Sequence, residues 1–224
     1  MLDYNRWILN VKEEDLRSEL HLISGNDKEI EDRFYKDLSF GTGGLRGVLG
    51  VGTNRMNVYT VEKATLGLAA YLKEFYKDES QISVVIAYDS RKKSEEFARI
   101  TAEVLSSQEI KAYLFSEITP TPVLSFAVRY LKANAGIVIT ASHNPKEYNG
   151  YKVYNKNGCQ ITDNAANAIT EKINDIDYFF KYTPNEELIT YLNNKVERAF
   201  LDEIKKYSLY EIPRESNLSI VDSP

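Results

Sequence analysis

The chain has 224 residues, of which 43% are hydrophobic and 27% are charged, and its formal net charge is −5. A globular chain of this length buries enough surface to form a proper core. An acidic chain without a basic cluster lacks the electrostatic footprint of a nucleic-acid-binding protein, so we expect no nucleic acid partner. The single cysteine excludes an internal disulfide and favours a reducing compartment.

No apolar run approaches the roughly 20 residues that a membrane span requires. Residues 1–15 are polar and acidic, with no apolar stretch of signal-peptide length. We therefore expect a soluble protein of the cytoplasm with no membrane partner.

The spacing of apolar residues predicts helices and strands in alternation. In the first half we expect polar helices over 12–23 and 28–38, a glycine-rich loop over 41–47, a short strand over 48–51, an amphipathic helix over 60–76 and a buried strand over 82–88. In the second half we expect a helix over 94–107, strands over 112–115 and 135–139 around a helix over 121–131, a hairpin of 151–155 with 159–161, and helices over 163–174 and 186–207. This alternation indicates a three-layer α/β/α domain with a mixed, mostly parallel sheet.

The C-terminal part of the chain predicts the beginning of a second domain. Residues 217–221 form a β-branched run, and a strand of this kind normally leads into an element that covers it. We therefore assign residues 1–185 to the first domain and residues 186–224 to the start of a truncated second α/β domain. The alternative is a C-terminal strand that joins the sheet of the first domain.

Ser142 lies in the segment 140–145 (Thr-Ala-Ser-His-Asn-Pro), directly after the apolar strand 135–139. As a hydrolase nucleophile it needs a histidine base, and His143 is its immediate neighbour, so the imidazole cannot easily reach back in triad geometry. A serine hydroxyl alone is an unusual metal ligand. Two interpretations remain from the local pattern: a phosphoryl carrier, or a residue that caps a turn.

Three further positions offer positive charge near such a carrier. Lys152 follows within the segment 149–152 (Asn-Gly-Tyr-Lys), and Arg46 ends the glycine-rich loop, whose backbone amides suit an anion. The same loop is also explained as a tight turn. Arg91 follows the strand 82–88, where ligands gather in α/β sheets. The alternative, which we favour at this position, is an Asp89–Arg91 pair that braces a loop.

Three motifs in this order resemble the α-D-phosphohexomutases: residues 40–47 (Phe-Gly-Thr-Gly-Gly-Leu-Arg-Gly), residues 88–91 (Tyr-Asp-Ser-Arg), and residues 140–145 through 149–152. The likeness is nearest to the phosphoglucomutase/phosphomannomutase branch, which includes phosphopentomutase-like enzymes. It implies a four-domain enzyme, an isomerase that moves a phosphoryl group between C1 and C6 of a sugar phosphate. The reaction would pass through a phosphoserine and a bisphosphorylated sugar intermediate.

The resemblance makes Ser142 the phosphoserine, with Arg46, Lys152 and His143 as its catalytic partners. It also implies Mg²⁺ bound in part through the phosphate on Ser142, and a sugar bisphosphate as activator. A free lysine has a pKa of about 10.4, so burial or a nearby cation must lower that pKa before Lys152 acts as a base. The implied substrate- and phosphate-binding residues are Thr140, Asn144, Asn149 and Arg91.

The chain also departs from the family pattern. The Asp-Gly-Asp-x-Asp-Arg metal loop of the family occurs nowhere in it, and the sugar-recognition loop and second phosphate loop are absent too. We therefore expect the N-terminal portion of a mutase, whose main magnesium ligands and partner domains are missing from this chain and which completes no catalytic cycle alone. The alternative is a free-standing sugar-phosphate-binding or regulatory module that keeps the fold without the chemistry.

Overall fold

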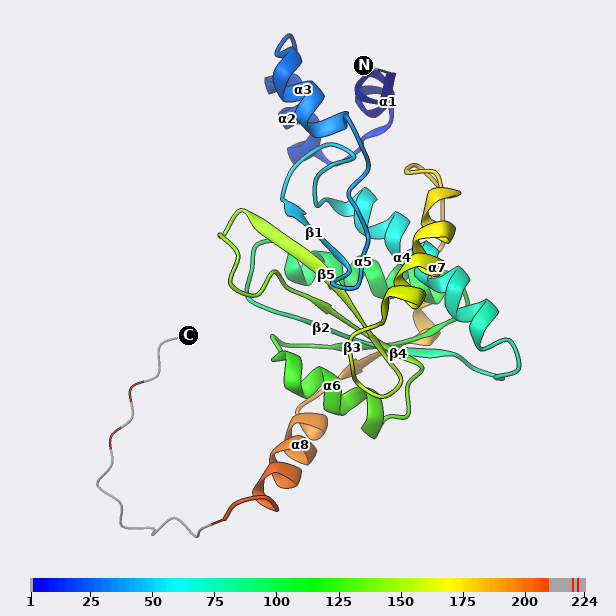
Figure 1. Cartoon of the computed structure of the whole chain (residues 1–224), viewed down its shortest axis with the longest axis vertical. Coiled ribbons are helices and arrows are strands. Elements are labelled where there is room, and N and C mark those ends of the chain that lie inside the picture. The colour runs from blue at the N-terminus through cyan, green and yellow to red at the C-terminus, as the bar shows by residue number, and fades with distance from the viewer. Residues whose placement is uncertain (1, 210–218, 220, 222–224) are drawn as a thin grey trace.

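The computed structural model describes residues 2–209, 219 and 221, in which strands and helices alternate (Figure 1). The strands are β1 (Leu45–Val48), β2 (Ser83–Tyr88), β3 (Lys111–Phe115), β4 (Ala135–Ile139), β5 (Tyr148–Asn155) and β6 (Ile189–Leu192). The helices are α1 (Leu2–Asn10), α2 (Glu14–Leu22), α3 (Asp27–Phe34), α4 (Val58–Phe75), α5 (Ser94–Ser107), α6 (Thr121–Tyr130), α7 (Asp163–Asn174) and α8 (Lys195–Lys205), with a 3-10 turn η1 (Glu186–Leu188).

The strands form a single sheet in the order β1-β5-β4-β2-β3-β6. Strands β4, β2, β3 and β6 pair in parallel, whereas β5 runs antiparallel to both β4 and β1. Val84, Val85 and Ile86 of β2 are all fully buried, as expected for a parallel strand covered on both faces. The predicted mixed, mostly parallel sheet is confirmed.

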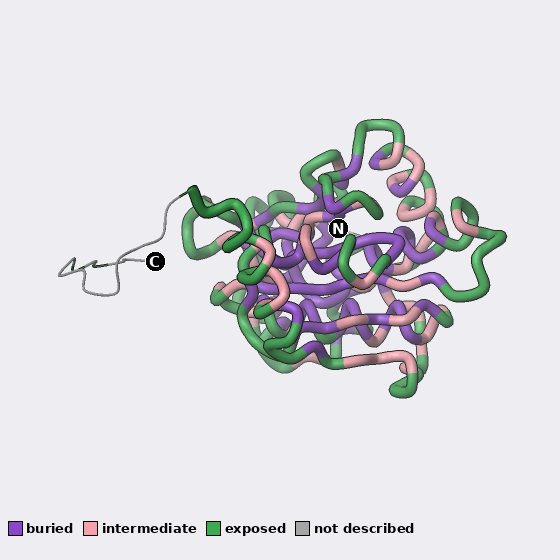
Figure 2. The backbone as a smooth tube through the Cα atoms, turned by 90° about the horizontal axis from the view of Figure 1, so that it is seen from below, coloured by how far each residue is buried: buried purple, intermediate pink, exposed green. Residues whose placement is uncertain are grey.

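Helices cover both faces of this sheet. Because side chains alternate along a strand, Val84 and Ile86 face a core that includes α4, α5 and α7, while Val85 and Ala87 face the core under α6 and α8. Figure 2 shows the buried segments gathered in the middle of the molecule. The three-layer fold is therefore confirmed. No helix in the part of the chain that the structure describes is long and apolar enough to cross a membrane.

Helix α1 was not predicted, because its short polar sequence carries little helical signal of its own. Trp7 is only 1% exposed, and its ring makes edge contacts with those of Phe34, Tyr59 and Tyr178. A helix of nine residues is marginal in isolation. Tertiary packing of the Trp7 ring therefore holds α1 in place.

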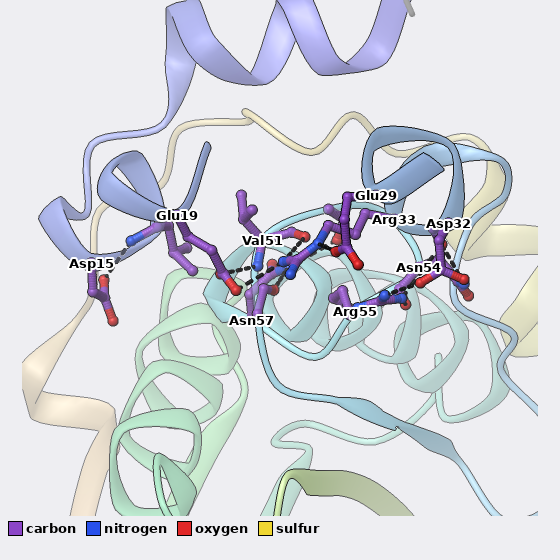
Figure 3. Close-up of polar contacts among 12 residues, drawn as sticks. Asp15, Glu19, Glu29, Asp32, Arg33, Val51, Asn54, Arg55 and Asn57 are labelled. Atoms are coloured by element: carbon purple, nitrogen blue, oxygen red, sulfur yellow. Dashed lines mark hydrogen bonds and ion pairs between the residues drawn. The ribbon is translucent and has the colours of Figure 1, made fainter. Parts of the chain in front are cut away.

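Helices α2 and α3 are tied to the segment 49–57 between β1 and α4 (Figure 3). Glu19 accepts hydrogen bonds from the amide of Val51 at 2.7 Å and from Nη1 of Arg33 at 2.8 Å. Asn57 caps α4 and donates its side-chain amide to the carbonyls of Gly50 and Gly52. These contacts fix the connection that follows β1.

Two predicted elements are wrong in place or type. The short strand lies over Leu45–Val48 rather than 48–51, because it pairs with β5 and so begins inside the glycine-rich segment. The helix predicted over 186–207 is η1, β6 and α8 instead. Pairing of β6 with the edge of β3 overrides local helical spacing there, which a single sequence does not reveal.

The turn of the predicted hairpin is confirmed, since Gly158 has a φ of 73° and Tyr154 bridges to Gln160.

Strand β6 carries the sheet past residue 185. The beginning of a second domain in residues 186–224 stays a prediction. The predicted strand over 217–221 lies outside the described residues, apart from positions 219 and 221.

One carboxyl group of α4, that of Glu62, is half-buried. Glu62 Oε1 accepts a hydrogen bond from the hydroxyl of Tyr182 at 3.1 Å. Removal from water raises the pKa of Glu62 to about 7, and the negative charges of Glu13 and Glu103 add to that rise, while the Tyr182 hydrogen bond opposes it. Folded Glu62 therefore keeps its proton at pH values at which an exposed glutamate has already released it.

We predict that stability falls as pH rises from 4.5 to about 7, because over that range folded Glu62 keeps a proton that the unfolded chain releases. The loss is at most on the order of 3 kcal/mol. Glu62→Gln should flatten this part of the pH profile, measured as the free energy of urea unfolding at each pH. Glu171→Gln, on the surface of α7, is the control. Equal pH profiles for the wild type and Glu62→Gln would contradict the assignment.

Candidate active site

The predicted site residues converge where β4 ends. The serine loop (residues 140–147) connects β4 to β5, and the Arg91 loop (residues 89–93) connects β2 to α5. Together they border an open hollow of about 800 Å³, lined by Asp89, Arg91, Ser142 and Asn144 among others. Parallel β2 and β4 are adjacent, so the loops that follow them meet at the same edge of the sheet.

Ser142 is exposed on the serine loop and has a φ of 54°, in the left-handed region. Its amide donates to the hydroxyl of Thr140 at 3.0 Å, and the amide of Asn144 donates to the carbonyl of Ala141 at 3.1 Å. A non-glycine residue in this region costs about 1–3 kcal/mol. The surrounding hydrogen bonds therefore stabilise a strained backbone turn on which Ser142 is exposed.

Lys152 of β5 reaches this hydroxyl, with its Nζ donating to Ser142 Oγ at 2.6 Å. Its partial burial lowers the pKa of Lys152, and the nearby positive charge of Arg46 lowers that pKa further, against the opposing charge of Asp89. A lysine with a lowered pKa is able to give up and take back a proton more readily near neutral pH. The hydroxyl and the amine are thus in direct hydrogen-bond contact.

Arg46 supplies a second cation from β1. It pairs in register with Gly150 of β5, and its Nη1 donates to Oδ1 of Asn144 at 3.0 Å. Gly44 makes this approach possible: its φ is 75°, and an added Cβ would lie 1.8 Å from the carbonyl oxygen of Tyr151. The glycine-rich segment therefore allows close packing of β1 against β5, which carries Arg46 to the serine loop.

Arg91 lies beneath the serine loop, with its side chain only 16% exposed. Its Nη1 donates to the carbonyls of Pro145 and Tyr148 at 2.9 and 3.1 Å. Its Nη2 donates to the carbonyls of Ser142 and Asn144 at 2.8 and 2.6 Å. The guanidinium therefore spans the serine loop from below.

Asn149 is fully buried. Its side-chain amide donates to the carbonyl of Lys92 and the hydroxyl of Ser94, both at 3.0 Å, and its Oδ1 accepts from the amide of Gly150 at 2.8 Å. His143 is exposed next to Ser142, and its side chain has no hydrogen-bond partner among the described residues.

The structure therefore sorts the predicted residues into two groups. Ser142, Lys152, Arg46 and Asn144 meet through hydrogen bonds at the open side of the loop, with His143 beside them. The side chains of Thr140, Arg91 and Asn149 make hydrogen bonds within the protein below that surface.

Two further residues contribute to the site: Asp89, which was predicted as the partner of Arg91, and Ser94, which was missed. Asp89 forms an ion pair with Nε of Arg91 at 3.5 Å, and Ser94 donates its hydroxyl to Asp89 at 2.7 Å. The Asp-Ser-Arg spacing had suggested the ion pair. Ser94 carried no such signal, because its partner comes from the preceding loop.

The residues present do not form a magnesium site by themselves. No group of three or more histidine, cysteine, aspartate or glutamate side chains within the described residues could hold a metal ion. Asp89 and Glu147 are the carboxylates that line the hollow near Ser142, and Asp89 is engaged by Arg91 and Ser94.

Comparisons with known proteins agree with this arrangement. The family described as "Phosphoglucomutase/phosphomannomutase, alpha/beta/alpha domain I" matches residues 37–179. A phosphoglucomutase of Staphylococcus haemolyticus is 43% identical over 85% of this chain and 35% of its own length. A human phosphopentomutase is 38% identical over 89% of this chain and 35% of its own length. A crystal structure from Thermus thermophilus, assigned as a phosphomannomutase, has a TM-score of 0.67 at 29% identity, over 77% of this chain and 36% of that one.

This chain thus spans about a third of the length of these curated relatives. The matched region contains β1 to β5, the serine loop and the Arg91 loop. The chain belongs to the phosphoglucomutase/phosphomannomutase family, and its residues 37–179 match the α/β/α domain I of that family.

Proposed function

We propose that this chain is the phosphoserine-bearing portion of a sugar-phosphate mutase, in which Ser142 carries the phosphoryl group that moves between C1 and C6 of the sugar. The observation that supports this most strongly is the 2.6 Å contact from Lys152 Nζ to Ser142 Oγ, beside Arg46. Relatives named phosphoglucomutase and phosphopentomutase agree with a mutase, an isomerase by reaction class.

In the transfer step, Ser142 Oγ attacks a phosphorus atom of a sugar bisphosphate. The bond from Oγ to phosphorus forms as the bond from phosphorus to the sugar oxygen breaks. The hydroxyl proton passes to the neutral amine of Lys152, and the ammonium ion so formed gives a proton to the departing sugar oxygen, which returns the amine to its neutral state. The lowered pKa of Lys152 supports this role, because it raises the fraction of neutral amine that can accept the proton.

Charge neutralisation is the other requirement. A phosphoserine carries about −1.5 to −2 charges near neutral pH, so the phosphate needs cations around it. Lys152 and Arg46 supply two, and Asn144 orients the guanidinium of Arg46. Thr140 holds the turn, and His143, which is exposed and follows Ser142 directly, would line the phosphate.

Magnesium, the sugar bisphosphate activator and the remaining domains of a mutase belong to the same proposal. A phosphate oxygen on Ser142 would be one magnesium ligand, and the other ligands would come from outside this chain. We also place the protein in the cytoplasm. Completion of the cycle requires parts that these 224 residues lack, since the family metal loop and second phosphate loop are absent from them.

A first prediction concerns the carrier. Purified chain incubated with glucose 1,6-bisphosphate and Mg²⁺ should gain one phosphoryl group by intact mass, located by peptide mapping on Ser142. Ser142→Ala should gain none. Ser90→Ala, which removes another exposed hydroxyl of the same hollow, should still be labelled. Label on a different residue, or no label on the wild type, would count against the proposal.

A second prediction concerns Lys152. Arg46→Gln should raise the pKa of Lys152 part of the way back to the ordinary value of a lysine. The rise should be incomplete, because burial lowers the pKa of Lys152 more than the charge of Arg46 does. The titration is followed by NMR of ¹³C-methylated lysine amines, with the Lys152 signal assigned from Lys152→Gln. Arg129→Gln, on exposed α6 surface, is the control and should leave the Lys152 titration unchanged. An unaltered Lys152 pKa in Arg46→Gln would show that the two cations do not interact.

A third prediction separates transfer from turnover. The purified chain should show no conversion of glucose 1-phosphate to glucose 6-phosphate above background in a coupled dehydrogenase assay, even where Ser142 accepts phosphate. Sustained conversion that Ser142→Ala abolishes would disprove the proposed incompleteness.

A further inference from the structure

We propose that Arg91 and Asn149 are positioning residues that lock the Arg91 loop and the serine loop together and hold Ser142 in its left-handed turn. Neither is then a ligand of the transferred phosphate, as the sequence had suggested. The consequence for phosphoryl transfer rests on the proposed function of Ser142. The lock itself is a property of the ligand-free protein.

The hydrogen-bonding capacity of Arg91 is used up inside the protein. A guanidinium has five N–H donors, four of them on its terminal nitrogens. Nη1 serves two carbonyls of the serine loop and its β5 end, Nη2 serves two more, and Nε faces Asp89. A phosphate bound by Arg91 would have to displace a carbonyl that shapes the serine loop.

Asn149 makes the reverse connection. It follows the serine loop, and both of its amide N–H groups donate to the other side, to the carbonyl of Lys92 and the hydroxyl of Ser94. It has no exposed surface with which to contact a ligand. Hydrogen bonds thus run in both directions between the serine loop with the start of β5 and the Arg91 loop with the start of α5, which makes them one structural unit.

The Arg91 loop is itself firmly anchored. The amide of Asp89 donates to the carbonyl of Ile139 at the end of β4, and its carboxylate accepts from the hydroxyl of Ser94. At the other end, Lys93 has a left-handed φ of 68° and pairs with Asp15 of α2 at 2.8 Å. A fixed base of this kind lets Arg91 restrain the more exposed serine loop.

Restraint reaches Ser142 directly, because Arg91 Nη2 bonds to the carbonyl of Ser142 itself. A lysine at position 91 would keep the positive charge, but its ammonium lacks the planar fork that reaches separate carbonyls on both sides. Arg91→Lys therefore distinguishes geometry from charge. Arg99→Lys, at an exposed ion pair on α5, is the matched control.

The first test is hydrogen–deuterium exchange of the ligand-free chain, read on peptides that cover residues 140–150. Arg91→Lys should exchange about tenfold faster there, while strands β2 and β4 and the Arg99→Lys control stay at wild-type rates. Unchanged exchange of the serine loop in Arg91→Lys would overturn the lock. If that variant does not fold, Ser94→Ala provides the same test through the anchor of Asp89, with a smaller increase expected.

The second test is the labelling of Ser142 by glucose 1,6-bisphosphate. A positioning role predicts a lower maximal labelling rate in Arg91→Lys with an unchanged half-saturating concentration of the bisphosphate. A higher half-saturating concentration with wild-type exchange would make Arg91 a phosphate ligand and overturn the inference. If the wild type is not labelled at all, the proposed function fails, whereas the exchange experiment still decides whether the lock exists.

Discussion

One hydrogen bond, from Lys152 Nζ to Ser142 Oγ at 2.6 Å, joins the hydroxyl and the amine of this site. It exists because β5 turns back antiparallel to β4, with Lys152 opposite Val138. The side chain of Lys152 then reaches the loop that leaves the end of β4. Strand β1 on the far side of β5 adds Arg46, whose charge helps to lower the pKa of Lys152.

Hydrogen bonds also stabilise the left-handed backbone of Ser142. A left-handed serine costs about 1–3 kcal/mol. Hydrogen bonds that involve a charged group contribute about 1.5–3 kcal/mol each, and Arg91 makes several to the serine loop. Those bonds are therefore sufficient to offset the strain, and the sheet edge supplies a rigid base for both loops.

Local patterns predicted the alternation of elements and the β4 strand. Short motifs also predicted that Ser142, Lys152 and Arg46 lie near one another. Contacts between distant segments escaped prediction. Helix α1 depends on packing of Trp7, and β6 depends on the free edge of β3. The side chain of Asn149 donates a hydrogen bond to Ser94, which lies fifty-five residues away in the chain. The sequence motif therefore singled out Asn149 but did not predict its hydrogen-bond partner.

The most direct measurement is the rate of Ser142 phosphorylation by glucose 1,6-bisphosphate in Lys152→Gln, compared with Lys156→Gln at the exposed turn that follows the same strand. A proton partner in contact with the nucleophile predicts a loss of about a hundredfold or more in Lys152→Gln, with wild-type unfolding free energy and wild-type rates in the control. Equal phosphorylation rates in the two variants would contradict the central role of the contact between Lys152 and Ser142.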